Sequence, residues 1–192
     1  PILGQVAAVV FVLLSPRSDP FFATPYFGGL LPGWLDVVLA GLAWLWFINL
    51  FNFMDGIDGL AGVETACVGV GIALVAVAAG LAAPFGAFGL TIAAAALGFL
   101  WWNWHPARIF LGDVGSVPLG FLLGWLLLGL AQNGEWAAAL ILPLYYLGDA
   151  TLTLLRRGLK GEKVWQAHRL HFYQQAVEAG LDHAQVVRHV LF

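Results

Sequence analysis

Long apolar segments alternate with short turns along most of this chain. A helix needs about 20 apolar residues to cross the hydrocarbon core of a bilayer, and several segments approach that length. Turns with Pro, Gly or polar residues separate them, for example at 15–20, 83–84 and 132–134. The pattern predicts an all-α polytopic transmembrane helix bundle of about six spans, at residues 1–14, 33–51, 63–83, 85–103, 115–131 and 135–155.

Composition supports a membrane protein. Of the 192 residues, 61% are hydrophobic and only 10% are charged, whereas a soluble domain is about 25% charged. The single cysteine, Cys67, lies within an apolar span, which excludes an internal disulfide and a cysteine-based metal site. Because no segment has the composition of a soluble domain, we interpret residues 1–192 as one integral-membrane domain.

Basic residues indicate which side of the membrane the polar segments share. Seven of the eight Lys and Arg residues follow either span 85–103 or span 135–155, and basic loops favour the cytoplasm. Counting crossings puts both regions on the same side as a polar cluster at 49–59, with Arg17 alone opposite. We therefore expect a cytoplasmic active-site cleft in a plasma-membrane protein.

The first polar segment, residues 49–62, brings Asn49, Asn52, Asp55 and Asp58 to the end of a Trp-rich span. Ionisable residues are costly in lipid, so such a cluster is a functional-site hypothesis. Asp55 and Asp58 are three residues apart and share a face if the segment is helical. A span end capped by solvated side chains is the alternative, and it accounts less well for four such residues within ten positions.

The second polar segment, residues 105–116, places Asp113 between two glycines directly before an apolar run. A carboxylate at a tight turn is a ligand type that Mg²⁺ accepts. Ser116 suits a helix N-cap, and the backbone N–H groups near it could face a phosphate. Taken alone, this segment is also an ordinary turn at the start of a helix.

The third polar segment, residues 156–175, contains His168, Arg169 and His171 within four positions. An arginine and two imidazoles are suitable partners for a pyrophosphate. Two histidines without a neighbouring carboxylate are weak support for zinc. Anchoring at anionic headgroups, at about 1 kcal/mol per basic residue, explains the remaining cations, Arg156, Arg157, Lys160 and Lys163.

Together the three segments offer acidic metal ligands, a basic phosphate grip and access to lipid. This combination favours phosphoryl transfer at the membrane surface, where positioning and a neutralising cation supply most of the catalysis. An ion-coupled transporter that uses the same aspartates is the alternative, but it predicts ionisable groups near mid-membrane. A purely structural subunit would not need these clusters.

The three segments resemble the polyprenyl-phosphate N-acetylhexosamine-1-phosphate transferases of glycosyltransferase family 4, at residues 49–61 (NLFNFMDGIDGLA), 110–116 (FLGDVGS) and 168–174 (HRLHFYQ). The resemblance implies transfer of a sugar 1-phosphate from a UDP-sugar to undecaprenyl phosphate, with release of UMP. It implies Mg²⁺, with Mn²⁺ as the alternative ion, and no nucleic-acid partner; a homodimer stays open. The O-antigen-initiating branch looks closest, because Arg169 follows His168 where the muramoyl-pentapeptide branch has consecutive histidines.

The resemblance also implies roles for individual residues. Asn52 and Asp113 would hold Mg²⁺ on the nucleotide pyrophosphate. Asp58 would contact the uracil, with Phe110 stacked on its ring, and Asp55 would be a further polar residue of the active site. The expected catalytic residues are Asp55, Asp113, His168, Arg169 and His171, of which the last three match the loop that grips the phosphates and the sugar. Ser116 is expected to bind substrate.

One departure from the family's pattern concerns the acceptor side of the site. The family carries an Asp-Asp pair on an earlier cytoplasmic loop, linked to the polyprenyl phosphate, and this chain has no such dipeptide. The chain also begins within an apolar run without Met and stops where another apolar run begins. We therefore expect a fragment that lacks the N-terminal spans and the C-terminal end and is inactive alone. Direct attack by the lipid phosphate is favoured over a covalent enzyme intermediate.

Overall fold

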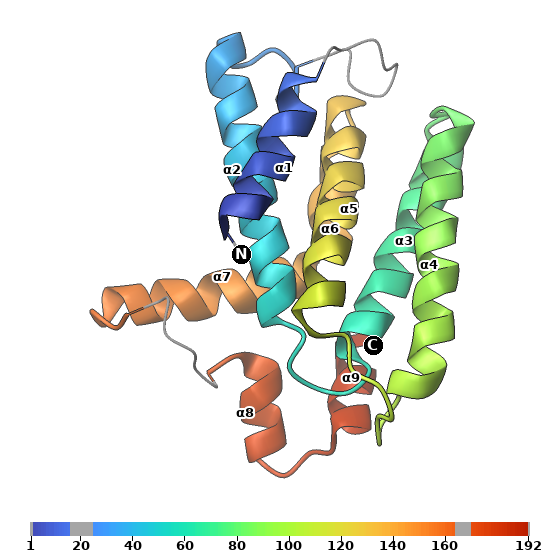
Figure 1. The fold of residues 1–192 in the computed structure, drawn as a ribbon, viewed down its shortest axis with the longest axis vertical. Coiled ribbons are helices and arrows are strands. Elements are labelled where there is room, and N and C mark those ends of the chain that lie inside the picture. Colours follow the sequence, from blue (N-terminus) through green and yellow to red (C-terminus); the bar gives the residue numbers. More distant parts are fainter. Residues whose placement is uncertain (1, 16–24, 164–169, 192) are drawn as a thin grey trace.

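The computed structural model describes residues 2–15, 25–163 and 170–191. Within these ranges every regular element is a helix (Figure 1), which confirms the all-α prediction. The helices are α1 (Ile2–Leu14), α2 (Gly33–Phe53), α3 (Leu60–Ala78), α4 (Ala83–Asn103), α5 (Gly112–Gln132), α6 (Trp136–Ile141), α7 (Leu144–Leu159), α8 (Phe172–Glu178) and α9 (His183–Leu191).

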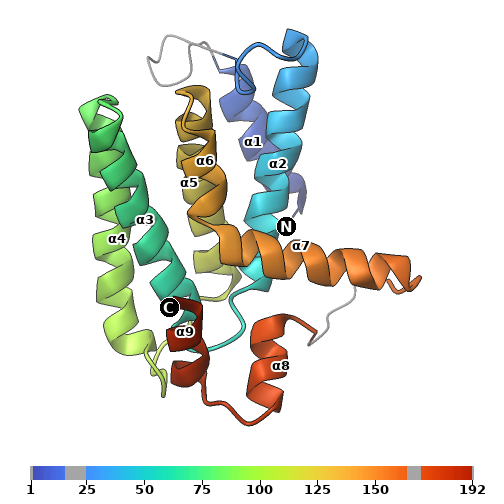
Figure 2. The same ribbon diagram turned by 180° about the vertical axis from the view of Figure 1, so that it is seen from behind.

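Four of these helices, α2 to α5, are long and apolar enough to cross a membrane, and α1 is a shorter apolar helix. They run roughly alongside one another in both views of the ribbon (Figures 1 and 2). Large apolar side chains such as Leu42, Leu74 and Leu97 remain exposed on their outer surfaces. An apolar surface of this kind is expected where helices face lipid.

The predicted span at 135–155 is wrong as a single helix. The helix α6 has six residues, and α7 begins at Leu144, directly after Pro143. Proline lacks a backbone N–H and cannot continue the hydrogen-bond pattern of a helix, so the helix is interrupted there. Beyond this break the chain changes direction, and α7 lies across the lower part of the bundle (Figure 1).

The surface pattern of α7 fits this orientation. Asp149, Thr153 and Arg157, spaced four residues apart, are buried against the protein. Leucines on another side of the helix are exposed instead. A helix with an exposed apolar side and a polar row against the protein is suited to lie along lipid. Residues 144–155 resemble a span in mean hydropathy because the few polar residues are diluted by these leucines: Leu144, Leu152 and Leu155.

Glycines allow the spanning helices to approach closely. A Cβ atom built on Gly69 of α3 would lie 2.6 Å from the carbonyl oxygen of Gly89 on α4. Between α2 and α5, a Cβ on Gly120 would lie 3.0 Å from Ile48 Cα. Small residues at helix contacts are a general device for packing in membranes. The α2–α5 contact matters most for function, because it brings the end of α2 next to the start of α5.

The loops that carry the first two polar segments lie at the same end of the bundle. In Figure 1 the α2–α3 loop and the α4–α5 loop are both at the lower end, and α8 and α9 lie at the same end. The expectation that these polar segments share one side is therefore confirmed.

The α3–α4 contact generates a stability prediction. Gly69→Ala is expected to lower the free energy of unfolding by about 1–3 kcal/mol, because its methyl group would overlap the Gly89 backbone. Gly98→Ala on α4 is the control, since no atom lies within 4 Å of its added Cβ, and it should be neutral or stabilising by up to about 1 kcal/mol. Unfolding of both variants in detergent would measure the difference; equal stability would contradict the close contact.

Candidate active site

Three side chains from the first two polar segments meet between the last turn of α2 and the first turns of α5. The amide nitrogen of Asn52 donates to Asp113 Oδ1 at 2.9 Å and to Ser116 Oγ at 2.8 Å. Ser116 Oγ in turn donates to the carbonyl oxygen of Gly112 at 3.0 Å. Ser116 is buried and Asp113 is exposed, so the cluster has an inner side fixed by the protein and an outer side open to a ligand. Gly112 adopts a φ of 59°, a left-handed conformation that glycine accepts readily.

Asp55 faces the same turn from the α2–α3 loop. Burial raises the pKa of its carboxyl group to about 6, a hydrogen bond from the Gly112 backbone opposes that rise, and the negative charge of Asp113 adds to it. Two carboxyl groups near one turn repel each other when both are ionised. A bound cation would relieve that repulsion.

The donor set at this turn fits Mg²⁺. The amide nitrogen of Asn52 donates to Asp113 and Ser116, so the amide oxygen of Asn52 is available as a ligand atom. No hydrogen bond among the described residues engages Asp113 Oδ2, and Asp55 supplies a second carboxylate. Carboxylate and amide oxygens are the ligands that Mg²⁺ prefers over nitrogen and sulfur.

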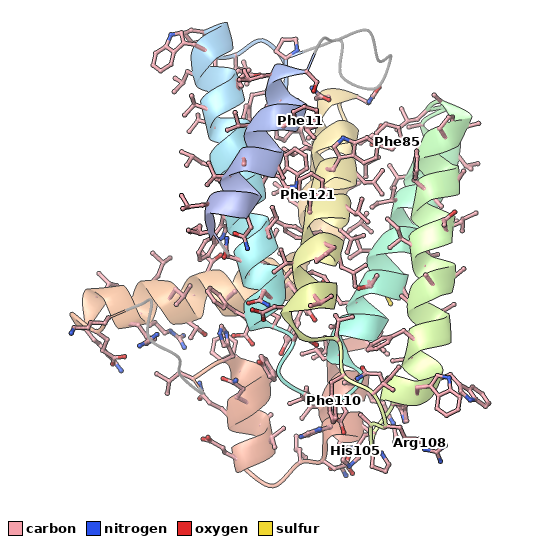
Figure 3. All side chains as sticks on the ribbon, in the orientation of Figure 1. Phe11, Phe85, His105, Arg108, Phe110 and Phe121 are labelled. Atoms are coloured by element: carbon pink, nitrogen blue, oxygen red, sulfur yellow. The ribbon has the colours of Figure 1, made fainter. Side chains whose placement is uncertain are left out.

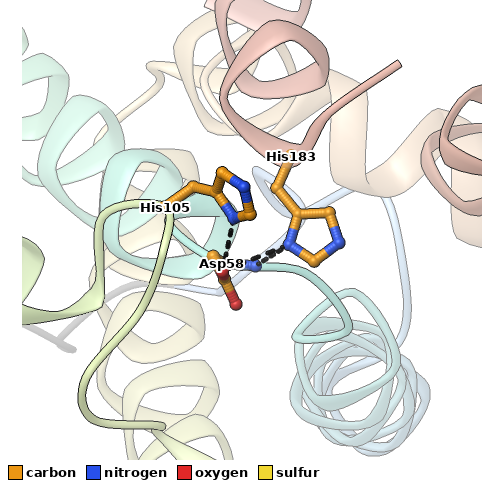
Figure 4. A group of neighbouring side chains, drawn as sticks. All are labelled: Asp58, His105 and His183. Carbon is orange, nitrogen blue, oxygen red and sulfur yellow. Dashed lines mark hydrogen bonds and ion pairs between the residues drawn. The ribbon is translucent and has the colours of Figure 1, made fainter. Parts of the chain in front are cut away.

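Asp58 does not join this turn and belongs to a second cluster (Figure 4). Its Oδ2 atom lies 2.7 Å from His105 Nδ1, 3.3 Å from His183 Nδ1 and 3.1 Å from the backbone nitrogen of Ala107. Burial acts to raise the pKa of Asp58, but the hydrogen bonds from the His105 side chain and the Ala107 backbone act against it, and the pKa lies below its usual value. The carboxylate is therefore held ionised.

Asn103 links the loops of the two motifs and was missed by the sequence analysis. Its Oδ1 accepts the backbone N–H of Gly59 at 3.0 Å, and its Nδ2 donates to the carbonyl oxygen of Ile109 at 2.9 Å. Asn103 is 5% exposed, so both hydrogen bonds are shielded from water. The available signal was a polar residue at the end of a Trp-rich span, as for Asn52. Phe110, next to Ile109, exposes most of its ring at this end of the bundle (Figure 3).

The third polar segment is placed only in part. His168 and Arg169 lie outside the described residues. His171 is buried, and its Nδ1 lies 3.0 Å from Asp149 Oδ1 on α7. Asp149 also accepts the backbone N–H of Phe172 at 3.0 Å. This carboxylate, which the sequence analysis did not select, therefore fastens the start of α8 to α7, and the expected catalytic role of His171 stays a prediction.

The start of α8 also contacts the α2–α3 loop. Tyr173 is buried, and its hydroxyl group donates to the carbonyl oxygen of Phe53 at 3.1 Å. A Cβ atom on Gly56 would collide with this hydroxyl group and lie 2.9 Å from the ring carbon that carries it. Glycine at position 56 is therefore required for the loop to pass so close to the tyrosine.

This contact predicts a coupled pair of substitutions. Gly56→Ala should destabilise the protein by about 1–3 kcal/mol through overlap with Tyr173, and Tyr173→Phe by about 1 kcal/mol through loss of one hydrogen bond. In the double variant the shortest overlap is absent, so its loss should be smaller than the sum of the two. Unfolding of all four proteins in detergent gives the coupling; strictly additive losses would mean that the loop and the tyrosine do not touch.

The sequence that forms this arrangement is similar to those of known proteins. The model of glycosyl transferase family 4 matches residues 2–131, a range that includes both the Asn52 and the Asp113 segments. A probable undecaprenyl-phosphate N-acetylglucosaminyl 1-phosphate transferase of Bacillus subtilis (strain 168) is 30% identical over 193 residues, covering 96% of this chain and 53% of that protein.

A second relative belongs to the muramoyl-pentapeptide group. The phospho-N-acetylmuramoyl-pentapeptide-transferase of Nitratidesulfovibrio vulgaris (strain DP4) is 36% identical over 137 residues, which cover 63% of this chain and 38% of that protein. The chain thus spans about half or less of the length of these curated relatives. The family match covers most of the chain and carries the residues that converge at the α2–α5 junction. The chain belongs to glycosyl transferase family 4.

Proposed function

We propose that this chain carries the nucleotide- and metal-binding part of a phosphoglycosyl transferase. The proposed reaction transfers an N-acetylhexosamine 1-phosphate from a UDP-sugar to undecaprenyl phosphate, releases UMP and starts a cell-envelope polysaccharide. The observation that carries the proposal is the convergence of Asn52, Asp113 and Ser116 at one turn. The activities for which both relatives are named support the same reaction class.

The α2–α5 turn would hold the pyrophosphate end of the donor. Asn52 and Asp113 are the proposed ligands of Mg²⁺ or Mn²⁺, with Asp55 beside them. When bound there, the ion supplies charge neutralisation for the phosphates. An oxygen of the lipid phosphate attacks the β-phosphorus of the UDP-sugar, the bond from this phosphorus to the bridging oxygen breaks, and UMP leaves. No protein nucleophile is required, which favours the direct route.

The second cluster and the loop beside it would recognise the base. The histidines and Ala107 engage Oδ2 of Asp58, and no described residue donates a hydrogen bond to Oδ1, so Oδ1 is left as an acceptor for an N–H group of uracil. Phe110 is 75% exposed, and a free aromatic face suits stacking on a base. Asn103 keeps the two loops at a fixed separation through Gly59 and Ile109.

An apolar groove between α2 and α7 would receive the isoprenoid chain of the acceptor. The groove has a volume of about 740 Å³ and is lined by Leu42, Trp46, Phe53, Leu154 and Leu155, among others. Phe53 is the direct neighbour of Asn52, so one end of the groove lies beside the last turn of α2, and we place the phosphate of the lipid at that end. The basic residues that follow α4 and α7 support a cytoplasmic position for this site in the inner membrane.

The proposal extends to the donor sugar and to the pathway that the product enters. An N-acetylhexosamine of the kind that initiates O-antigen is suggested by the order His168-Arg169 in the sequence. The ion-transport alternative has no support, because Asp55, Asp58 and Asp113 lie in or beside loops at one end of the bundle rather than along its length.

Loss of the proposed metal ligand tests the reaction. Membranes would contain the protein with any segments that its gene encodes beyond residues 1–192, and would receive UDP-N-acetylglucosamine labelled in the sugar and undecaprenyl phosphate. We expect Mg²⁺-dependent labelled lipid that falls by at least about 100-fold in Asp113→Asn, since even partners of metal ligands contribute 10- to 100-fold.

The control for this assay is Glu135→Gln, which alters an acid just before α6, at the opposite end of α5 from Asp113. It should retain wild-type transfer. If UDP-N-acetylglucosamine yields no lipid, N-acetylgalactosamine and N-acetylfucosamine donors would be tried. Failure with all three donors, or undiminished transfer by Asp113→Asn, would overturn the proposal.

A further inference from the structure

Three potential metal ligands from distant parts of the chain lie close together at the end of the bundle that carries the α2–α3 and α4–α5 loops. Asp58 lies in the α2–α3 loop, His105 in the α4–α5 loop, and His183 is the first residue of α9 (Figure 4). One ligand atom from each residue lies within 4.8 Å of the other two. Both imidazole side chains are about one-third exposed, so an ion from solution has access to them.

In this cluster, no proton lies between His183 Nδ1 and Asp58 Oδ2. The backbone N–H of Asp58 donates to His183 Nδ1 at 3.2 Å, so this nitrogen carries a lone pair and not a proton. The same nitrogen lies only 3.3 Å from the ionised Asp58 Oδ2. Two acceptors at this distance repel each other. A cation bound to both atoms would replace the Asp58 N–H at the single lone pair of Nδ1 and would turn the repulsion into two favourable contacts.

We propose that Asp58, His105 and His183 form a Zn²⁺ site that is separate from the Mg²⁺ site at Asp113 and that fastens α9 to the two active-site loops. Two imidazoles and one carboxylate are a ligand set that Zn²⁺ accepts, whereas Mg²⁺ prefers oxygen ligands alone. With three protein ligands, the fourth position of a tetrahedral ion is left for water or substrate.

The distances in the cluster are compatible with this assignment. Metal–ligand bonds of about 2.0–2.1 Å in a tetrahedron separate neighbouring ligand atoms by about 3.3 Å. The Asp58–His183 distance, 3.3 Å, already has this value. The Asp58–His105 distance of 2.7 Å is that of a hydrogen bond and would open by about 0.6 Å as the ion replaces the proton. Rotation of the partly exposed histidine rings supplies this adjustment.

The site does not depend on the proposed transferase reaction. It uses Oδ2 of Asp58 and leaves Oδ1 for a nucleotide, so an occupied zinc site would orient the carboxylate and keep it ionised. It also joins the C-terminal helix α9 to the loops that follow α2 and α4. Binding of the ion can be measured without any UDP-sugar or lipid, so its failure and a failure of the reaction are distinguishable.

Cobalt binding tests the proposal. The full chain would be purified in detergent, stripped with a chelator and titrated with Co²⁺, which reports its geometry through visible absorption. We expect about one Co²⁺ per chain with the intense bands of tetrahedral coordination, displaced by Zn²⁺. Saturating Zn²⁺ should also raise the Tm by about 5 °C.

Matched variants locate the site. His105→Asn and His183→Asn should each weaken Co²⁺ binding by at least about 10-fold, because each removes a direct ligand. His189→Asn alters an exposed histidine on the same helix as His183 and should bind as the wild type does. Asp113→Asn should also retain the cobalt spectrum, which would separate this site from the proposed Mg²⁺ site.

Two results would overturn the inference. Absence of a tetrahedral cobalt spectrum in the wild-type protein would mean that the cluster is held by hydrogen bonds alone. A spectrum that survives unchanged in both His105→Asn and His183→Asn would place the ion elsewhere in the chain.

Discussion

The side-chain amide of Asn52 joins the last turn of α2 to the first turns of α5, at the end of the bundle that carries the proposed active site. It donates to both Asp113 and Ser116, residues 61 and 64 positions away along the chain. A hydrogen bond to a charged group contributes about 1.5–3 kcal/mol to stability. For function, the more important consequence is that it fixes the orientation of the Asn52 amide. Because the start of α5 engages the amide nitrogen, the amide oxygen of Asn52 has no hydrogen bond among the described residues and is available as a ligand atom next to Asp113. The proposed metal site is therefore built before any ligand arrives.

This interaction depends on how closely α2 and α5 can pack. Cβ atoms at Gly120 and Gly124 would lie 3.0 Å or less from Ile48 Cα and from the ring of Trp44, respectively. Larger residues at these positions would separate the two helices and move Asn52 away from Asp113. The helix contact in the apolar region thus controls the position of polar groups at its end. In this sense the packing of the bundle helps to build the proposed active site.

The helices α8 and α9 contact the same end of the bundle. Tyr173 of α8 contacts the carbonyl oxygen of Phe53, and His183 at the start of α9 contacts Asp58. The loop between α2 and α3 is thereby held on both sides of its aspartates. Asp149 on α7 positions this unit through His171. Such support restricts the motion of the loop, which would help the proposed site to orient a pyrophosphate.

The sequence predicted most of the helices, because hydropathy reports directly on spans and their ends. The pairing of Asn52 with Asp113 was predicted from the family resemblance. It did not predict the break at Pro143, since mean hydropathy hides a polar row that is diluted by leucines. It also failed to separate Asp58 from Asp55. Which loop each carboxylate faces depends on contacts with His105 and His183, which are distant in sequence.

Binding of a UDP-sugar to the purified chain is the most direct test of the central claim that the Asn52–Asp113 junction is a metal and nucleotide site. Isothermal titration calorimetry would compare UDP-N-acetylglucosamine binding to the wild type and to Asn52→Leu, with and without Mg²⁺. The account predicts binding only with Mg²⁺, and at least about 10-fold weaker binding in the variant. Equal binding without the ion, or by Asn52→Leu, would contradict it.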